Sequence, residues 1–338
     1  MKFLESLYIK VFVSIVVEKE ASDVYISIYS KNKLIDSYEE SYDTNSIDEK
    51  MISFIKSYTK ETPYFYISIL DNSKNQGAIP TCSKNLMSNY HDMSESTHKC
   101  QNSQWTHFTS KNDLYDIERK YQDIGIDFIF SPFSVLSNFF KDKIDGPIGV
   151  FVLLQGESIS LSVFENSELI YAQHLDMNII QDTEEFETID TVQDIMMEGE
   201  DDGIDLDSVE ADEEMDSLDD FGDIEDLDDL DDIDDFDKTE DVEEEFYQES
   251  DGVPEQESEE TFNEDYQRFT HIQKSIHNFY EDSNYDSEFL ENIYIADAVG
   301  VTSELKRYFE EELFMNVYIR QIALTTEVSE LAVSEVLT

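Results

Sequence analysis

Five side chains between residues 82 and 107 are of the types that bind transition metals: Cys82, His91, His98, Cys100 and His107. Cysteine thiolates and histidine imidazoles are the common ligands of structural zinc. A specific zinc signature also contains a pair of closely spaced cysteines, and these two are far apart in the chain. A zinc site therefore stays open as one interpretation. The other is a polar surface insert with two reduced thiols.

Aspartates dominate residues 201–237 and superficially resemble calcium-binding loops. An EF-hand loop needs a glycine at its sixth position, and the sequence DLDDLDDIDDFDK has none, so specific calcium binding is not expected. Apolar residues recur there at every third position, which fits neither a helix nor a strand. We expect these apolar side chains to dock into a partner, with a plain solvated spacer as the alternative: Leu218, Phe221, Ile224, Leu227, Leu230, Ile233 and Phe236.

The glycines argue against the common nucleotide-binding enzymes. The chain has 10 glycines, and none lies in a GxGxxG or GxxxxGK[ST] pattern. Such patterns let backbone amides approach a phosphate closely. GxSxG and HExxH, which mark hydrolase nucleophiles and zinc proteases, do not occur either. The motifs therefore exclude these enzyme classes and predict no cofactor.

Charge is distributed very unevenly along the chain. The formal net charge is −58, and half of the 80 acidic residues lie in residues 181–260, where Lys238 is the single basic residue. Self-repulsion predicts that this segment is disordered. A strongly negative field also argues against binding of nucleic acid, whose phosphates require clusters of Lys and Arg.

The sequence predicts a cytoplasmic protein. No apolar stretch reaches the length of a membrane-spanning helix, and Glu5 and Lys10 interrupt the only candidate for a signal peptide. Two cysteines do not make a disulfide framework, so reduced thiols are expected.

A repeated strand pattern predicts the fold. With an offset of 135 residues, the apolar positions of residues 24–35 fall on those of residues 159–170, and each copy contains an Asn-bearing turn. Alternating apolar and polar residues on either side of the turn predict antiparallel strands with one buried face. The two copies therefore indicate a duplicated α/β architecture, unless two unrelated meanders match by chance.

Other elements follow from periodicity and from turn residues. We expect helices over 46–59, 114–122 and 133–140, strands over 64–70 and 126–130, and an irregular insert over 71–110. Beyond the acidic segment, we expect helices over 269–279 and 305–314, strands over 293–295 and 317–322, and then a short acidic end.

This order of elements resembles the actin-like fold, in particular the PilM protein of type IV pilus machines and the cytoplasmic part of the type II secretion protein GspL. Residues 149–175 resemble the second phosphate-binding strand pair of that family, and residues 293–322 resemble its closing strand, helix and strand. The resemblance implies a degenerate actin-like fold with duplicated ribonuclease-H-like lobes and a long disordered acidic insert. The expected divisions are residues 1–145 for the first lobe, 146–180 for the start of the second, 181–260 for the acidic segment and 261–338 for the remainder of the second lobe.

The chain departs from the family at the nucleotide positions. ATP-binding relatives carry Asp-x-Gly in the second turn, where this chain has Leu154 and then Gly156. The first turn, residues 17–23, has no glycine, and the Gly-Gly pair beneath the adenosine is reduced to Gly300. Resemblance and departures together imply a member that is not an enzyme.

The resemblance implies a scaffold of an envelope-spanning machine, either a pilus or secretion assembly or a flagellar motor. Such a scaffold binds the cytoplasmic tail of a PilN-like inner-membrane protein and can form a homo-oligomeric ring beneath the membrane. Phe128, Phe130 and Phe133 are the candidate residues near the tail-binding groove, although such aromatics often belong to a core. Two alternatives remain: an actin-like ATPase with an atypical nucleotide site, and an acidic adaptor or chaperone without a membrane partner.

Overall fold

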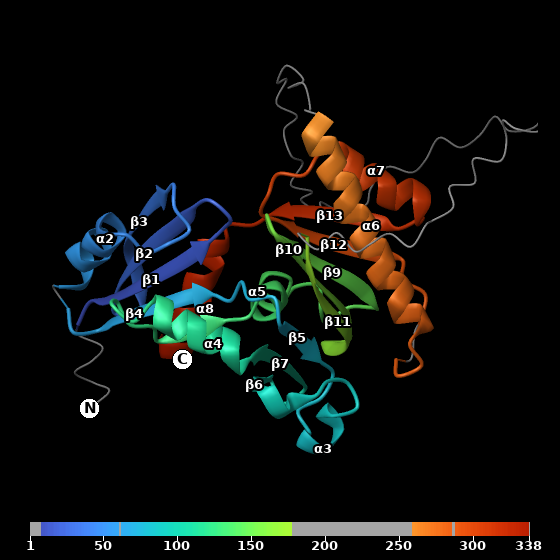
Figure 1. Cartoon of the computed structure of the whole chain (residues 1–338), viewed down its shortest axis with the longest axis horizontal. Helices are drawn as coiled ribbons and strands as arrows, with labels where there is room; N and C mark the ends of the chain where they lie inside the picture. The colour runs from blue at the N-terminus through green and yellow to red at the C-terminus, as the bar shows by residue number, and fades with distance from the viewer. Residues whose placement is uncertain (1–7, 61, 178–258, 286–287, 338) are drawn as a thin grey trace, which may run out of the picture. The chain divides into compact units, whose positions relative to one another are not determined.

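The computed structural model describes residues 8–60, 62–177, 259–285 and 288–337 (Figure 1). The predicted disordered segment lies outside the described residues, apart from its last two. So do the seven apolar residues at every third position: Leu218, Phe221, Ile224, Leu227, Leu230, Ile233 and Phe236.

The first half of the chain forms a five-stranded sheet in the order β3-β2-β1-β4-β8. Strands β1, β2 and β3 are antiparallel, whereas β4 and β8 run parallel to β1. Residues in the β2–β3 turn have positive φ, Lys31 at 51° and Asn32 at 62°, as tight hairpins require. The strands are Lys10–Val17, Ser22–Ser30, Lys33–Tyr42, Phe65–Leu70 and Phe128–Phe130 for β1, β2, β3, β4 and β8.

The second half forms another five-stranded sheet in the corresponding order β11-β10-β9-β12-β13, with the same pattern of antiparallel and parallel pairs. Its β10–β11 turn also has two residues with positive φ, Asn166 and Ser167. Two copies of this sheet are the duplicated ribonuclease-H-like arrangement of the actin-like fold, so the predicted fold class is confirmed. The strands are Gly149–Leu154, Ser158–Glu165, Glu168–Asp176, Asn292–Asp297 and Asn316–Gln321 for β9, β10, β11, β12 and β13.

Helices cover the outer faces of both sheets, and side-chain caps fix where they begin. Asp48 accepts a hydrogen bond from the Met51 amide at the start of α2, and Ser131 caps α5 ahead of a proline in its first turn. Met51 and Ile55 of α2 pack on the first sheet in one hydrophobic core. Apolar residues of α6 and α7 pack on the second sheet in another. The helices are α2 Glu49–Thr59, α3 Lys84–Met87, α4 Lys111–Lys120, α5 Pro132–Phe139, α6 Glu259–Glu281, α7 Ser303–Glu312 and α8 Leu324–Leu337, with the 3₁₀ turn η1 Met93–Glu95.

Each half of the chain contributes one helix to the other half. Helix α5, which follows β8, packs on β9 and β10, and helix α8, which follows β13, packs on β1, β2 and β4. Both helices contribute to one shared core, which includes Leu136 and Val328. Ser14 Oγ donates to the Thr325 carbonyl at 2.6 Å, and the hydroxyls of Ser27 and Ser329 lie 2.8 Å apart. The predicted short acidic end after residue 322 is therefore wrong, because these buried positions hold a helix.

The predicted irregular insert over residues 71–110 is also wrong. It forms a three-stranded antiparallel sheet in the order β5-β7-β6, with α3 and η1 beside it. Its polar composition concealed the strands: β6 is largely exposed, and β5, which is buried, has only four residues. Gly77 is required here, because a Cβ at this position would lie 2.7 Å from the Phe108 ring. The strands are Gln76–Ile79, Ser96–Gln101 and Trp105–Ser110 for β5, β6 and β7.

Cys82 and Cys100 form a disulfide, which corrects the expectation of two reduced thiols. Their Cα atoms lie 5.5 Å apart, within the usual range for a bridge. The disulfide ties the segment before α3 to β6, and both sulfurs are therefore unavailable to a metal. None of the described helices combines the length and the apolar character that crossing a bilayer requires.

Candidate functional site

In the first sheet, the β1–β2 turn lies at the edge where the parallel strand β4 ends. In the second sheet, the β9–β10 turn lies at the edge where the parallel strand β12 ends. Val17 and Glu18 of the β1–β2 turn, with the β9–β10 turn from Gln155 to Ser158, line a cavity of about 80 Å³. Asn72 and Asp176 complete its wall, together with Lys74, Gly156, Glu157 and His174. This is the position where an actin-like fold would hold the phosphates of a nucleotide.

The cavity is acidic. Burial, with the charges of Asp23 and Glu157, raises the pKa of the Glu18 carboxyl above its ordinary value. Among the described residues, Lys74 is the only lysine or arginine that lines the cavity, and its Nζ lies 2.5 Å from Asp176 Oδ2. Because this lysine is already paired, the described lining offers no free cation to a phosphate.

Side chains of the two halves also bond to each other across the cavity. Asn72 Nδ2 donates to the Val17 carbonyl, and Gln155 Nε2 donates to Asn72 Oδ1 at 3.3 Å. Leu154, the residue expected at the position of a nucleotide-binding aspartate, is fully buried in the core of the second sheet. A Cβ added at Gly156 would meet no described atom within 4 Å, so no close approach requires this glycine.

The turn after β12, which would lie beneath an adenosine, is filled by a carboxylate of the chain. Asp297 is fully buried and its two oxygens accept hydrogen bonds from the amides of three consecutive residues, at 2.9, 2.9 and 3.0 Å: Val299, Gly300 and Val301. Gln321 Nε2 donates to the same carboxylate at 2.5 Å. Consecutive backbone amides that converge in a turn are the groups that bind anions in many proteins. Here the chain's own anion occupies them.

The start of α7 is occupied in the same way. Thr302 caps this helix, and its amide and hydroxyl both donate to Asp265 Oδ2 at 2.8 Å. Arg268 in turn donates to Asp265 Oδ1 at 2.7 Å, so the buried carboxylate is paired with a nearly buried guanidinium. The amino end of α7 is therefore closed to a phosphate as well.

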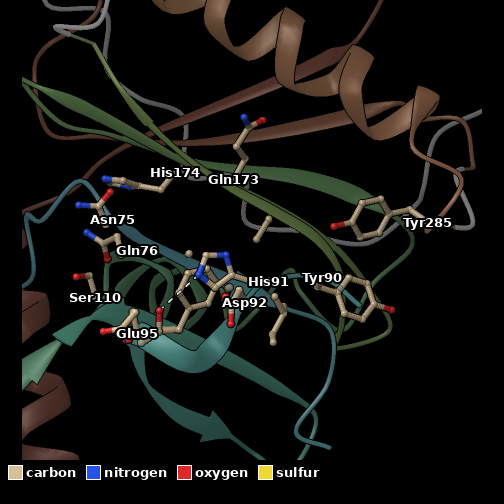
Figure 2. Close-up of a pocket in the computed structure, with 16 residues that line it drawn as sticks. Asn75, Gln76, Tyr90, His91, Asp92, Glu95, Ser110, Gln173, His174 and Tyr285 are labelled. Atoms are coloured by element: carbon tan, nitrogen blue, oxygen red, sulfur yellow. Dashed lines mark hydrogen bonds between the residues drawn. The ribbon is translucent and has the colours of Figure 1, made fainter. Parts of the chain in front are cut away.

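The three-stranded sheet has a larger hollow on each of its faces. Side chains alternate between the faces of a strand, so His107 and Thr109 of β7 point to one side and Phe108 and Ser110 to the other. The first pair lines a groove of about 310 Å³, and the second pair lines a pocket of about 480 Å³ (Figure 2).

The groove lies between the three-stranded sheet and the edge of the first sheet. Thr97 and Lys99 of β6 form one wall, and Leu114 of α4, Ile126 and Ile129 form the other. Asp71 lies at its base, where Thr109 Oγ1 donates to Asp71 Oδ2 at 2.7 Å, and burial raises the pKa of this carboxyl. The groove thus combines apolar side chains with hydrogen-bonding groups, as sites for extended segments do.

The structure does not assemble the candidate zinc ligands. Cys82 and Cys100 are bonded to each other, and the His91 ring stacks on Phe108 with its centroid at 4.0 Å. Among the described residues, no group of three or more His, Cys, Asp or Glu side chains could hold a metal ion. Burial lowers the pKa of His107 to about 4, which is typical of a neutral core imidazole.

The three aromatic residues that the sequence proposed for tail binding differ in burial, and none of them lines the groove. Phe130 and Phe133 are 5% and 2% exposed and belong to the shared core, whereas Phe128 is half-buried at the edge of the first sheet. Their neighbour Ile129 lines the groove. The pocket on the other face is formed by β11, which the sequence predicted, together with β5, β7 and the segment near Tyr90, which it did not.

Two family models match the chain, one described as Domain of unknown function (DUF8569) over residues 8–137, the other as Domain of unknown function (DUF8341) over residues 150–337. No curated protein matches it.

Among solved structures, a Bacteroides thetaiotaomicron protein with an actin-like ATPase fold and unknown function is 12% identical, with a TM-score of 0.43, over 95% of this chain and 93% of its own. A PilM–PilN type IV pilus biogenesis complex is 12% identical, with a TM-score of 0.35, over 49% of this chain and 61% of its own. MreB5 of Spiroplasma citri bound to ADP is 8% identical, with a TM-score of 0.27, over 50% of this chain and 52% of its own.

The assignment of the fold rests on the strand order of the two sheets and not on these similarities. The DUF8341 model alone spans more than half of the chain. The chain therefore belongs to the family described as Domain of unknown function DUF8341.

Proposed function

We propose that this chain is a non-catalytic scaffold of an envelope-spanning machine and holds the cytoplasmic tail of a PilN-like inner-membrane protein. The observation that carries the non-catalytic part is the Asp297 carboxylate, which occupies the amides of Val299, Gly300 and Val301. A nucleotide would have to displace this buried anion and also enter an acidic cavity of about 80 Å³.

The groove on the three-stranded sheet supports the tail-binding part. It is about 310 Å³ in volume and is lined by Leu114, Ile126 and Ile129 together with polar side chains of β6 and β7. A short extended tail could place alternate apolar side chains on these residues and its polar groups on the strands. The partner class comes from the resemblance to the PilM family, and the machine would be a pilus, a secretion assembly or a flagellar motor.

We further propose that the chain is peripheral at the inner membrane through this partner and can form a ring. The acidic segment would recruit another component through its regularly spaced apolar residues. The Cys82–Cys100 disulfide opposes a cytoplasmic location, because disulfides are rare in reducing compartments. The redox state of these cysteines in the cell is therefore part of the test.

The direct test is purification of the tagged chain from its native membrane fraction in mild detergent. Recovery of a small single-span protein would support the proposal. Thr97→Trp, which fills the groove from an exposed strand position, should abolish that recovery. Ser37→Trp, on the exposed strand β3, is the matched control and should not. Equal recovery with both variants, or recovery of soluble partners alone, would refute tail binding in the groove.

A further inference from the structure

The outer edge of the second sheet is formed by β13, which pairs with β12 and has no neighbour on its other side among the described strands (Figure 1). The Asn316 amide donates toward β12, to the Glu291 carbonyl at 2.8 Å. Because these directions alternate along a strand, the amide and carbonyl groups of Val317 and Ile319 point to the open edge. Such an edge can accept a further strand.

Strand β13 lacks the side chains that usually protect an edge from pairing. Edge strands are commonly guarded by lysines, prolines or several charges. Strand β3, at the edge of the first sheet, carries charges of this kind, among them Lys33, Asp36 and Glu39. Strand β13 has the sequence NVYIRQ, and its one charged side chain, Arg320, is paired with Asp142 at 3.0 Å. In a chain with 80 acidic residues, this edge is therefore unusually free of charge.

A row of aromatic rings crosses the second sheet and ends at the same edge. Phe151 of β9, Tyr294 of β12 and Tyr318 of β13 lie opposite one another in the register of the sheet. Their rings are stacked, with centroids 5.0 Å apart in both contacts and planes tilted by 13° and 15°. This repeat matches the spacing of strands, about 4.8 Å. Tyr318 is 49% exposed, so the row ends in an open ring where the next strand would lie.

The sequence of β13 is complementary to itself in antiparallel register. When Tyr318 lies opposite Tyr318 of a second copy, Val317 lies opposite Ile319 of that copy. Val317 and Ile319 have the outward main-chain groups, so they form the hydrogen-bonded pairs. The two tyrosines form a non-hydrogen-bonded pair, in which side chains lie closest, and the row of rings continues into the second sheet. Arg320 faces Asn316 of the second copy, so no like charges are opposed.

Phe314 gives a second indication that this edge is covered. Its side chain is 82% exposed, and its φ of 54° lies in the left-handed region that favours glycine. It precedes β13 by two residues, so an antiparallel strand paired with β13 would end beside it. Burial of the ring against that strand would offset the cost of the backbone conformation.

We propose that two copies of this chain associate through their β13 strands and join two five-stranded sheets across a twofold axis. Such a dimer is closed and is distinct from a ring. It uses neither the tail groove nor the acidic segment, so it stands independently of the scaffold role. The net charge of −58 on each copy opposes association, and added salt should therefore tighten the dimer by screening this repulsion.

Sedimentation of the full chain over a concentration series tests the proposal. We expect a monomer–dimer equilibrium that tightens at least about threefold between about 0.15 M and about 0.5 M NaCl. Tyr318→Lys places a guarding lysine at the centre of the interface and should weaken the dimer at least about tenfold. Tyr38→Lys, the same change at an exposed tyrosine of the other edge strand, β3, is the matched control and should not weaken it. A chain that stays monomeric up to about 100 µM, or equal weakening by both variants, would overturn the proposal.

Oxidative cross-linking tests the register. Cys82 and Cys100 are bonded to each other and are the only cysteines of the chain, so an introduced cysteine is the one free thiol. Tyr318→Cys should give a covalent dimer, because the Cα atoms of a non-hydrogen-bonded pair lie about 4.5 Å apart. Asn316→Cys should not, because it would lie about 13 Å along the strand from its counterpart. Cross-linking of both variants, or of neither, would refute the twofold pairing of β13.

Discussion

The two five-stranded sheets share a strand order, but the chain inserts different elements into them. In the first half, the three-stranded sheet with its disulfide lies between β4 and α4. In the second half, residues 178–258 lie between β11 and α6. Both hollows that could accept a partner lie on the three-stranded sheet. The repeated sheets supply the frame, and the insertion between β4 and α4 supplies both hollows.

Strand β4 of the first half leads to the buried Asp71, and strand β12 of the second half ends at the buried Asp297. The two aspartates differ in what they bind. Asp297 accepts the amides of its own turn. Asp71 likewise accepts an amide of its own turn, that of Ser73, but it also accepts the hydroxyls of Ser73 and Thr109, and thereby fastens β7 of the three-stranded sheet to the end of β4. In both halves the carboxylate holds neighbouring parts of the fold together. Both aspartates serve as structural acceptors.

The largest expected effect comes from removing the helix that the second half contributes to the first. Truncation before Leu324 deletes α8 and exposes its buried contacts on the first sheet, among them Val328. Each such side chain contributes about 1.5–3 kcal/mol, so we expect the first sheet to unfold. Hydrogen exchange should show loss of protection in β1, β2 and β4 while β9, β10 and β12 keep theirs. Equal protection of both sheets would contradict this account of the exchanged helices.

Removal of the disulfide should have the next largest effect, and it should be local. Cys82→Ala/Cys100→Ala opens a loop whose closure is worth about 2–4 kcal/mol. We expect early loss of hydrogen-exchange protection in β5, β6 and β7, with both five-stranded sheets unchanged. Thiol labelling of the wild-type chain in intact cells reports its compartment. Labelling of the cysteines before reduction would support a cytoplasmic location, and labelling only after reduction would argue for an oxidising compartment.

Acid should destabilise the three-stranded sheet through a buried histidine. Burial lowers the pKa of His107 from 6.5 to about 4, so the unfolded chain takes up a proton at a higher pH than the folded chain does. Stability is therefore present above pH 6.5 and is lost as the pH falls toward 4. Between pH 7 and 5 the loss is about 2 kcal/mol. His107→Gln should reduce this dependence in urea unfolding and leave the part due to His174, whose pKa burial also lowers to about 4. An unchanged slope would show that His107 is not buried as described.

The sequence predicted the sheets well because each repeats a strong alternating pattern. Residues 24–35 and 159–170 were correctly aligned and lie in matching strands and turns. The three-stranded sheet was missed because β6 is polar and mostly exposed. Helix α8 was missed because its sequence is apolar on several sides and follows a strand closely. The candidate pocket could not be predicted, because it joins β5, the segment near Tyr90 and β11, which are far apart in sequence.

The smallest changes in stability are expected for substitutions at two glycines, Gly156 and Gly300, which lie at the degenerate nucleotide positions. Gly300 has φ of +79°, so Gly300→Ala should cost about 1–2 kcal/mol through backbone strain. Gly156 has open space for a Cβ and no positive φ, so Gly156→Ala should change stability by less than about 0.5 kcal/mol. Thermal unfolding of the two variants checks the difference. A large cost at Gly156 would mean that its backbone has a role not visible in the cavity.

If the chain's own carboxylates occupy the place of a nucleotide, magnesium ATP should not bind to the chain. We expect about 1 mM Mg–ATP to leave the unfolding temperature of the full chain unchanged and to give no saturable heat in calorimetry. A site with a Kd of about 10 µM would instead stabilise the chain by about 2.7 kcal/mol at that concentration. Saturable, magnesium-dependent binding would contradict this expectation and would favour the actin-like ATPase over the non-catalytic scaffold.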